Sequence, residues 1–340
     1  MLPIHQSPGQ PVILGAAPGR VTGPWREPFP AMEPRTALLA ARHVVPHTDA
    51  DGLAAGALAL RARGEQAGSA VLLARGEVPF GAAPRLPPGS VAVLDWGIRP
   101  LARAGVIVDH HVPETSDPGP DMAVMSGYGA DPEVTTAVLV RRLFPEQPAW
   151  LAAIGAAGDL GDRGFALPEC AGAPRTAVRR LVPLVNAPRR LPDGPVRTAL
   201  ALLVEHDDPR EALRDPRVAD LEDARRRWRA AFDAAVRTAP RVGADVALLR
   251  FCSPFQVHPL VATTWARRLA PRVVIAANDG YLPGRVNFAV RGGGGTDLRA
   301  LLRAALPEAG GEYAHGHAAA TGGSLEPGAF ARLVAALGVP

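Results

Sequence analysis

The sequence predicts an α/β protein of two domains, and three observations support this. Between residues 42 and 162, short apolar runs rich in β-branched residues alternate with helical stretches. Apolar runs that do not alternate with polar residues are typical of parallel strands covered on both faces. Strand-like runs return after Gly243, beyond a long helical stretch, and a length of 340 residues suits two domains.

The first domain is expected to contain strands at 42–47, 70–74, 90–95 and 105–109. A helix should follow the first strand at 52–64, because Leu53, Ala57 and Leu60 recur at three- or four-residue spacing. A short helix is also expected around 99–104. Because strands and helices alternate, these elements predict a parallel sheet.

The remaining elements form a connector and a second domain. From 168 to 195 the sequence is rich in Pro and Arg, and from 196 to 238 it is helical. The segment 220–233 predicts a long amphipathic helix between the domains. The second domain should contain strands at 245–251, 273–277 and 285–290, and a helix capped by Thr296.

These patterns divide the chain into four parts. Residues 1–35 are a Pro- and Gly-rich extension without regular structure, or sequence ahead of a start at Met32. The first domain covers 36–195, a helical connector covers 196–240, and a smaller α/β domain covers 241–340.

Composition excludes several classes of protein. No run of about 18 apolar residues occurs, so we expect no membrane-spanning helix, and the N-terminus lacks the pattern of a secretory signal. Two cysteines cannot form a disulfide scaffold, so a cytoplasmic protein is expected. The net charge of +4 lies within 241–340, where ten Arg face six Asp or Glu, and such an excess favours phosphate-bearing partners.

Acidic and imidazole side chains cluster in four short segments of the first domain. Each segment follows a predicted strand or an apolar helix, and the residues are His47, Asp49, Asp51, Asp95, Asp109, His110, His111 and Asp159. Ligands bind at the carboxyl edge of open parallel sheets, where such groups converge. Several carboxylates at one edge repel one another unless a cation neutralises them, and carboxylate with imidazole suits Mn²⁺, Zn²⁺ or Fe²⁺.

Each residue taken alone has an ordinary structural explanation. Asp95 could cap a turn, Asp49 and Asp51 could cap the following helix, and His47 could be a loop histidine. The tandem His110-His111 after an apolar strand is harder to explain by packing. Together the four segments predict a metal site.

These segments resemble the four signature motifs of the DHH phosphoesterase superfamily, which is named for the Asp-His-His found here at 109–111. The second domain adds to the resemblance. The segment 310–323, Gly-Gly-Glu-Tyr-Ala-His-Gly-His-Ala-Ala-Ala-Thr-Gly-Gly, is similar to the glycine-rich motif of the DHH-associated C-terminal domain. The segment 286–291 resembles the strand that presents that domain's substrate-binding Arg. The resemblance covers roughly residues 40–335.

The resemblance implies a binuclear metal site in the cleft between the domains. One ion would be bound by His47 and Asp49, the other by Asp51, His110 and Asp159, with Asp95 bridging them. His111 would contact the substrate phosphate, and Asp109 would support the imidazoles. The expected cofactor is two Mn²⁺ ions, with Mg²⁺ or Co²⁺ as substitutes. His43 is a weaker alternative ligand, and the match of Gly155-Ala-Ala-Gly-Asp159 to the motif favours Asp159 over Asp162.

The resemblance also implies which residues bind substrate in the second domain. They are Arg291, His315, Gly316, His317, Gly322 and Gly323. Glycines let backbone N–H groups approach an anion closely, and an Arg can bind a phosphate bidentately. The segment Ala314-His315-Gly316-His317 departs from the usual Gly-Gly-Gly-His, because Ala314 and His315 stand at the first two glycine positions.

The expected reaction is metal-dependent hydrolysis of short single-stranded RNA or DNA to mononucleotides. A phosphodiesterase for cyclic di-AMP or a linear dinucleotide, and a phosphatase for 3′-phosphoadenosine 5′-phosphate, are alternatives of the same class. An alternative of another class is a non-catalytic nucleic-acid-binding partner in replication or repair. The sequence leaves open whether the protein is a homodimer.

Overall fold

The computed structural model describes residues 32–81, 85–310 and 313–339, without the side chains of 315–317. The chain forms two compact units. Unit 1 runs to Arg189 and includes Pro195–Glu222, and unit 2 comprises Arg190–Gly194 and the residues from Asp223 onward. The predicted extension at 1–35 lies mostly outside the described residues, and its last two positions already begin helix α1 (Pro34–Ala40).

Unit 1 contains a parallel sheet, as predicted. Its strands, in spatial order, are β1 (His43–Pro46), β2 (Val91–Leu94), β3 (Gly105–Asp109) and β4 (Met122–Ser126). Both faces are buried, because successive side chains such as Val44 and Val45 belong to different apolar clusters. Runs of consecutive apolar residues therefore correspond to strands with no solvent-exposed face.

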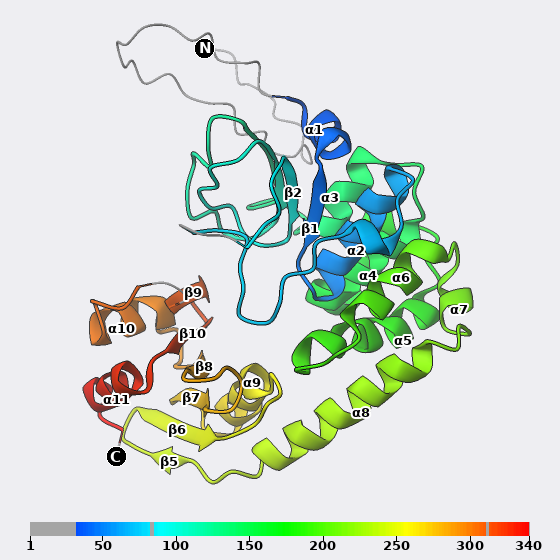
Figure 1. Ribbon diagram of the computed structural model, residues 1–340. Helices are drawn as coiled ribbons and strands as arrows, with labels where there is room; N and C mark the ends of the chain where they lie inside the picture. The colour runs from blue at the N-terminus through cyan, green and yellow to red at the C-terminus, as the bar shows by residue number, and fades with distance from the viewer. Residues whose placement is uncertain (1–31, 82–84, 311–312, 340) are drawn as a thin grey trace, which may run out of the picture. The chain divides into compact units, whose positions relative to one another are not determined.

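Helices cover one face of this sheet, and loops cover the other (Figure 1). The helices are α1, α2 (Ala50–Ala62), α3 (Thr136–Leu143), α4 (Ala149–Leu160), α5 (Arg175–Asn186), α6 (Val196–Glu205) and α7 (Pro209–Ala212), with short 3₁₀ turns η1 (Ala67–Ser69), η2 (Gly161–Ala166), η3 (Pro168–Cys170) and η4 (Pro188–Arg190). The loop face is packed by Leu73, Phe80, Leu86, Ile98 and Leu101. None of the helices in the described part of the chain has the length and apolar character needed to cross a membrane.

Several elements differ from the prediction. Segment 70–74 is not a strand, since only Val71 joins β1, through its N–H to Val44 O at 2.9 Å. Segment 99–104 is not helical, which fits the restriction that Pro100 imposes on the backbone before it. Strand β4 was not predicted, because its sequence Met-Ala-Val-Met-Ser has one β-branched residue.

The predicted connector is shorter than 196–240. Leu200, Leu202 and Leu203 of α6 are buried in the same apolar cluster as α2, so α6 belongs to unit 1. Helix α8 (Val218–Ala235) corresponds to the predicted amphipathic helix, and the boundary between the units falls inside it. Of the predicted connector, α8 therefore contains the point where the chain passes from unit 1 to unit 2 for the last time, after an earlier excursion at Arg190–Gly194.

In its described part, unit 2 has a mixed sheet of six strands, in which only the pairing of β6 with β7 is parallel. The spatial order is β5 (Arg241–Val242), β6 (Val246–Phe251), β7 (Val273–Asn278), β8 (Val286–Gly292), β10 (Ala320–Leu325), β9 (Tyr313–His317). Three helices accompany it, α9 (His258–Arg268), α10 (Leu298–Ala305) and α11 (Pro327–Ala336). The three predicted strands are confirmed.

The helix predicted to begin at Thr296 is capped one residue later. Asp297 accepts hydrogen bonds from Arg299 N at 2.9 Å and Ala300 N at 3.2 Å, and it is the N-cap of α10. The Thr296 hydroxyl instead donates to Gly293 O at 2.7 Å.

Candidate metal centre

Acidic and imidazole residues follow three neighbouring strands of the parallel sheet. His47 and Asp49 come after β1, Asp95 follows β2, and Asp109 ends β3. Parallel strands place their carboxyl ends at one edge, so these residues converge although they are up to 62 positions apart.

Two helix N-termini hold the first pair of carboxylates. Asp49 is the N-cap of α2, with Oδ1 accepting from Gly52 N at 3.0 Å. Its Oδ2 lies 2.8 Å from His47 Nδ1, so capping and participation in the cluster are both present. Asp51 is fully buried and accepts from Thr136 N at 2.7 Å and Ala137 N at 2.9 Å, at the start of α3. These backbone donors fix both carboxylates.

Asp95 lies in the middle of the cluster. Its Oδ2 is 3.6 Å from His47 Nδ1, and its Oδ1 is 3.6 Å from His110 Nε2. The residue is 3% exposed and has a φ of 69°, a left-handed conformation that costs energy for a residue with a Cβ. The Thr136 hydroxyl donates to Asp95 Oδ1 at 2.9 Å. The fold thus holds a buried carboxylate in a strained position between two histidines.

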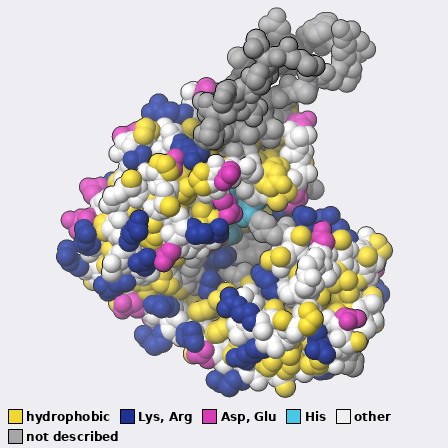
Figure 2. All heavy atoms as spheres, turned by 180° about the vertical axis from the view of Figure 1, so that it is seen from behind, with side chains coloured by type: hydrophobic (Ala, Val, Ile, Leu, Met, Phe, Trp, Pro, Cys, Tyr) yellow, Lys and Arg dark blue, Asp and Glu magenta, His cyan; other side chains and the backbone are white. Residues whose placement is uncertain are grey.

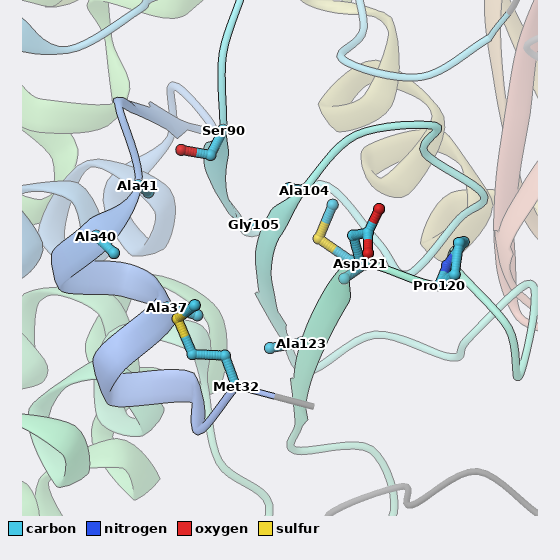
Figure 3. Close-up of a pocket in the computed structure, with 11 residues that line it drawn as sticks. Met32, Ala37, Ala40, Ala41, Ser90, Ala104, Gly105, Pro120, Asp121 and Ala123 are labelled. Carbon is cyan, nitrogen blue, oxygen red and sulfur yellow. The ribbon is translucent and has the colours of Figure 1, made fainter. Parts of the chain in front are cut away.

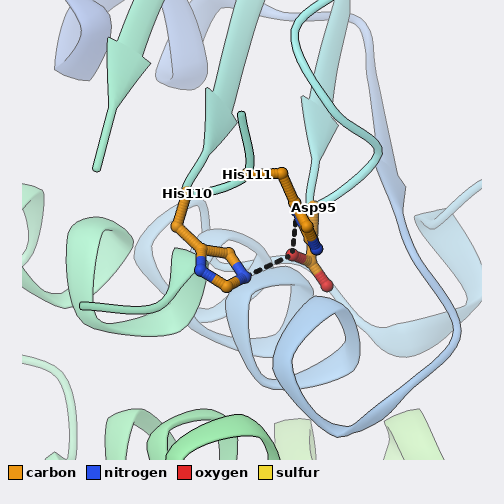
Figure 4. Close-up of side chains that lie close together, drawn as sticks. All are labelled: Asp95, His110 and His111. Atoms are coloured by element: carbon orange, nitrogen blue, oxygen red, sulfur yellow. Dashed lines mark ion pairs between the residues drawn. The ribbon is translucent and has the colours of Figure 1, made fainter. Parts of the chain in front are cut away.

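The three residues of the Asp-His-His segment have different contacts. Figure 4 shows the rings of His110 and His111 both directed at the carboxylate of Asp95. Asp109 accepts from Gly97 N at 2.6 Å and from His111 N at 2.7 Å, and its Oδ1 lies 3.2 Å from His111 Nδ1. Asp109 therefore orients the His111 ring. His110 Nε2 lies 3.4 Å from Asp159 Oδ2 and 3.9 Å from Asp51 Oδ2, so His110 contacts these two carboxylates in addition to Asp95.

Asp159 reaches the cluster because α4 packs closely against α2. A Cβ at Gly155 would overlap Asp51 Oδ1 and lie 2.6 Å from Ala137 Cβ. Glycine is therefore required there, and it brings Asp159, one turn further along α4, beside His110.

The two alternative ligands lie elsewhere. Asp162 forms an ion pair with Arg179 at 2.9 Å, and His43 Nε2 lies 3.2 Å from Pro88 O. Neither belongs to a potential metal-binding group among the described residues.

The donor atoms fall into three groups, each with its atoms within 4.8 Å of one another. The groups are His47, Asp49 and Asp95; Asp51, His110 and Asp159; and Asp95, His110 and His111. Asp95 and His110 are each shared by two groups. Each of these groups could hold a cation.

Electrostatics also favour a cation here. Burial, and then the charges of Asp49, Asp51, Asp109 and Asp159, raise the pKa of Asp95 well above its usual value. Burial and the charge of Asp159 raise the pKa of Asp51 to about 6. Without a cation, such a cluster holds protons in place of the missing positive charge.

The histidines respond to the same charges. Burial lowers the pKa of His110, but contact with Asp159 and the charges of Asp51 and Asp159 outweigh it and raise the pKa to about 9. Its Nε2 is buried and has no hydrogen bond of good geometry within the described residues. Burial would raise the pKa of Asp49, yet the charge and hydrogen bond of His47 and the charge of Arg189 bring it well below its usual value. An orphaned imidazole nitrogen facing carboxylates fits a divalent cation.

The predicted substrate residues of unit 2 lie on two paired strands. Arg291 on β8 is partly buried, and its Nη1 donates to Val290 O at 2.8 Å and Thr321 O at 3.1 Å. Burial lowers its pKa. A Cβ at Gly322 would overlap the Phe288 carbonyl oxygen, so that glycine is needed for strand packing.

The rest of the glycine-rich motif is described only in part. Gly316 lies on the backbone of β9 and Gly323 on that of β10, where the pairing of the two strands shifts register. The side chains of His315 and His317 lie outside the described residues, so their predicted contacts stay predictions. The predicted placement of the site between the two domains also stays a prediction.

Two supporting residues escaped the sequence analysis. Thr136 contacts both Asp51 and Asp95, and Asn186 Oδ1 accepts from Ala50 N at 3.0 Å. Thr135-Thr136 ahead of an apolar helix is a capping signal that could have drawn attention to the first. No local pattern identifies the second.

A separate cavity of about 450 Å³ lies at the opposite edge of the sheet (Figure 3). Ser90, Gly105 and Met122 line it at the beginnings of β2, β3 and β4, together with Ala37 of α1. Asp121 is its one acidic lining residue among those described. By contrast, histidines reach the surface beside acidic side chains on the face drawn in Figure 2, in agreement with the 25% exposure of His47 and 43% of His111.

No family model matches the chain, and no curated protein does. Solved structures are similar in fold. RecJ from Thermus thermophilus in complex with Mn²⁺ has a TM-score of 0.63 at 22% identity, over 93% of this chain and 56% of that one. An exonuclease RecJ bound to manganese has a TM-score of 0.58 at 21% identity, over 93% of this chain and 97% of that one. The DHH domain of a member of the s1p family of ribosomal proteins has a TM-score of 0.59 at 15% identity, over 89% of this chain and 87% of that one.

This chain thus spans about half the length of the Thermus RecJ. The agreement with these structures extends over both units, since at least 89% of the chain is covered each time. The chain therefore has the fold of RecJ and the DHH-domain proteins.

Proposed function

We propose that this protein is a metal-dependent phosphoesterase of the DHH superfamily that hydrolyses phosphodiester bonds of short single-stranded oligonucleotides. The observation that carries the proposal is Asp95, a buried carboxylate shared between two groups of potential ligands at the carboxyl edge of the sheet. Similar structures named as exonuclease RecJ contain manganese, which supports a nuclease-type reaction at this edge.

The proposed ligands follow the geometry. His47 and Asp49 would hold one cation, Asp51, His110 and Asp159 the other, and Asp95 both. Mn²⁺ is the proposed metal, with Mg²⁺ as a substitute, because RecJ is known with each. Bound divalent cations supply Lewis-acid charge and lower the pKa of water.

Other residues of the cluster would handle the phosphate. The His111 side chain is 43% exposed, and Asp109 fixes its orientation through Nδ1. We propose that His111 donates a hydrogen bond to a phosphoryl oxygen, while Asp109 stabilises the imidazolium form. Burial lowers the pKa of His111, but the hydrogen bond to Asp109 and its charge raise it overall, which favours a proton donor.

Substrate recognition is proposed for unit 2, through Arg291 and the glycine-rich motif. The chain's excess positive charge lies in 241–340, and aromatic residues make up 5% of the whole chain. Binding of long single strands usually depends on repeated stacking of bases on aromatic side chains. A short substrate therefore fits this composition better. A cytoplasmic location is part of the same proposal.

A substrate panel tests the proposal. It contains dinucleotides, ~5-mers and ~20-mers of RNA and DNA, cyclic di-AMP and 3′-phosphoadenosine 5′-phosphate, each with Mn²⁺, Mg²⁺ or Co²⁺. We expect the highest kcat/KM on the shortest linear oligomers with Mn²⁺. Preference for a cyclic dinucleotide or a phosphoadenosine would reassign the substrate within the same chemistry. Binding of oligonucleotides without turnover would support a non-catalytic nucleic-acid-binding protein.

A further inference from the structure

Arg189 lies beside the acidic cluster, on the short turn η4 that follows α5. The chain is fixed at this point, because Asn186 at the end of α5 accepts from Ala50 N at the start of α2. Arg189 Nη2 is 3.9 Å from Asp49 Oδ2, and the side chain is 24% exposed. The fold therefore places a permanent cation at the rim of the proposed metal site.

Asp49 does not satisfy this guanidinium. Asp49 Oδ1 already accepts from Gly52 N, and Oδ2 lies 2.8 Å from His47 Nδ1. At 3.9 Å, the contact with Arg189 is too long for a hydrogen bond. The Nε of Arg189 is buried without a hydrogen-bond partner among the described residues. An unpaired buried donor costs free energy, which a bound acceptor would recover.

Arg63, another arginine of unit 1, has a guanidinium that is hydrogen-bonded by protein groups. Arg63 donates to the carbonyl oxygens of Leu38 and Ala41 and, through Nε and Nη2, to Glu65, so its guanidinium is occupied by the protein. Arg63 has a structural role. Arg189, with one long contact to a carboxylate that is itself engaged, has capacity left for a ligand.

We propose that Arg189 binds a phosphoryl oxygen of the substrate at the metal site. This inference rests on the proposed function. A phosphate approaching five clustered carboxylates is repelled, and Arg189 adds positive charge at the rim of that cluster. The planar guanidinium presents several N–H groups in a geometry that matches phosphate oxygens, and it cannot act as a metal ligand.

The test compares Arg189→Ala and Arg189→Lys with the wild type in the full-length protein. The matched control is Arg179→Ala, which removes an exposed arginine of α5 that pairs with Asp162. We expect Arg189→Ala to lower kcat/KM on a dinucleotide about 10- to 100-fold, the range for a charge-assisted hydrogen bond, mainly through KM. Bound Mn²⁺ should not change. Lysine should restore part of the loss, and Arg179→Ala should match the wild type.

Titration of inorganic phosphate into the Mn²⁺-loaded protein separates this inference from the proposed function. Weaker phosphate binding by Arg189→Ala than by the wild type supports the inference even if no substrate in the panel is hydrolysed. Equal phosphate binding by both, or none by the wild type, overturns it. Loss of Mn²⁺ with unchanged KM also overturns it, because Arg189 would then only neutralise Asp49.

Discussion

Two largely buried histidines of the described residues, one in each unit, have pKa values moved in opposite directions. His110 in unit 1 faces Asp51, Asp95 and Asp159, and its pKa is raised to about 9. His258 begins α9 in unit 2, where burial and then the charge of Arg291 lower its pKa to about 3. Both side chains lose water, so neighbouring charge decides the direction.

The contrast fits the division of labour proposed above, with metal in unit 1 and phosphate recognition in unit 2. Carboxylates dominate the surroundings of His110, whereas burial and the charge of Arg291 both keep His258 neutral. Hydrolysis of a phosphoester at a metal site needs carboxylates that hold the cations and a positively charged group that holds the phosphate. Each of the following predictions tests whether the two units differ in this way.

The largest effect should come from Asp95→Asn, which removes the shared carboxylate. We expect kcat on a dinucleotide to fall at least ~1000-fold and bound Mn²⁺ to fall as well, because neither position keeps its full set of oxygen ligands. Metal content by atomic absorption and turnover at saturating Mn²⁺ check this. Two bound ions with near-normal turnover would contradict the shared role.

Gly155→Ala should disturb the same site through the packing of α4 against α2. The new Cβ would overlap Asp51 Oδ1, so α4 must move away from α2 and take Asp159 with it. Overpacking of a core typically costs about 1–3 kcal/mol of unfolding free energy. We expect this loss in urea denaturation, together with weaker Mn²⁺ binding. Gly328→Ala, at an open helical position of α11 with no atom within 4 Å of the added Cβ and no positive φ, tests the general cost of replacing a helical glycine.

His258→Gln should change the response to acid. The folded pKa of about 3 is below the usual 6.5, so the unfolded chain binds the proton more readily, and stability is lost as the pH falls below about 6.5. This single group should cost about 2 kcal/mol at pH 5 relative to pH 8. Urea denaturation at both pH values should show that the variant loses less stability than the wild type. An equal loss of stability in both proteins would show that protonation of His258 does not destabilise the fold.

Asp162→Asn should have the smallest effect. Its carboxylate forms an exposed ion pair with Arg179, and such pairs contribute about 0–1 kcal/mol. Turnover and Mn²⁺ content should equal those of the wild type. A loss of metal in this variant would make Asp162 a ligand in place of Asp159, and the assignment around His110 would have to be revised.

The residues that converge on the site could be predicted because parallel strands fix where their ends meet. The acidic and imidazole positions after β1, β2 and β3 follow from that rule and from the motifs. Asn186 and Arg189 could not be predicted, since tertiary packing brings them beside the start of α2 and no local pattern marks them. Thr136 was missed although a capping signal precedes it, because its contact with Asp95 depends on the packing of α3. The same limit explains segment 70–74, whose apolar sequence packs beside β1 through a single hydrogen bond.

The burial of helix α2 limits how the site can change. Every residue from Ala50 to Leu60 is buried, including Asp51. The amide hydrogens of such a segment exchange with solvent only when a large part of the unit opens. We therefore expect the ligands on α2 to be among the slowest-exchanging parts of the protein, with or without metal. A segment buried in this way should tolerate little variation, so substitutions along α2 should disturb the position of Asp51 before they change any other part of the cluster.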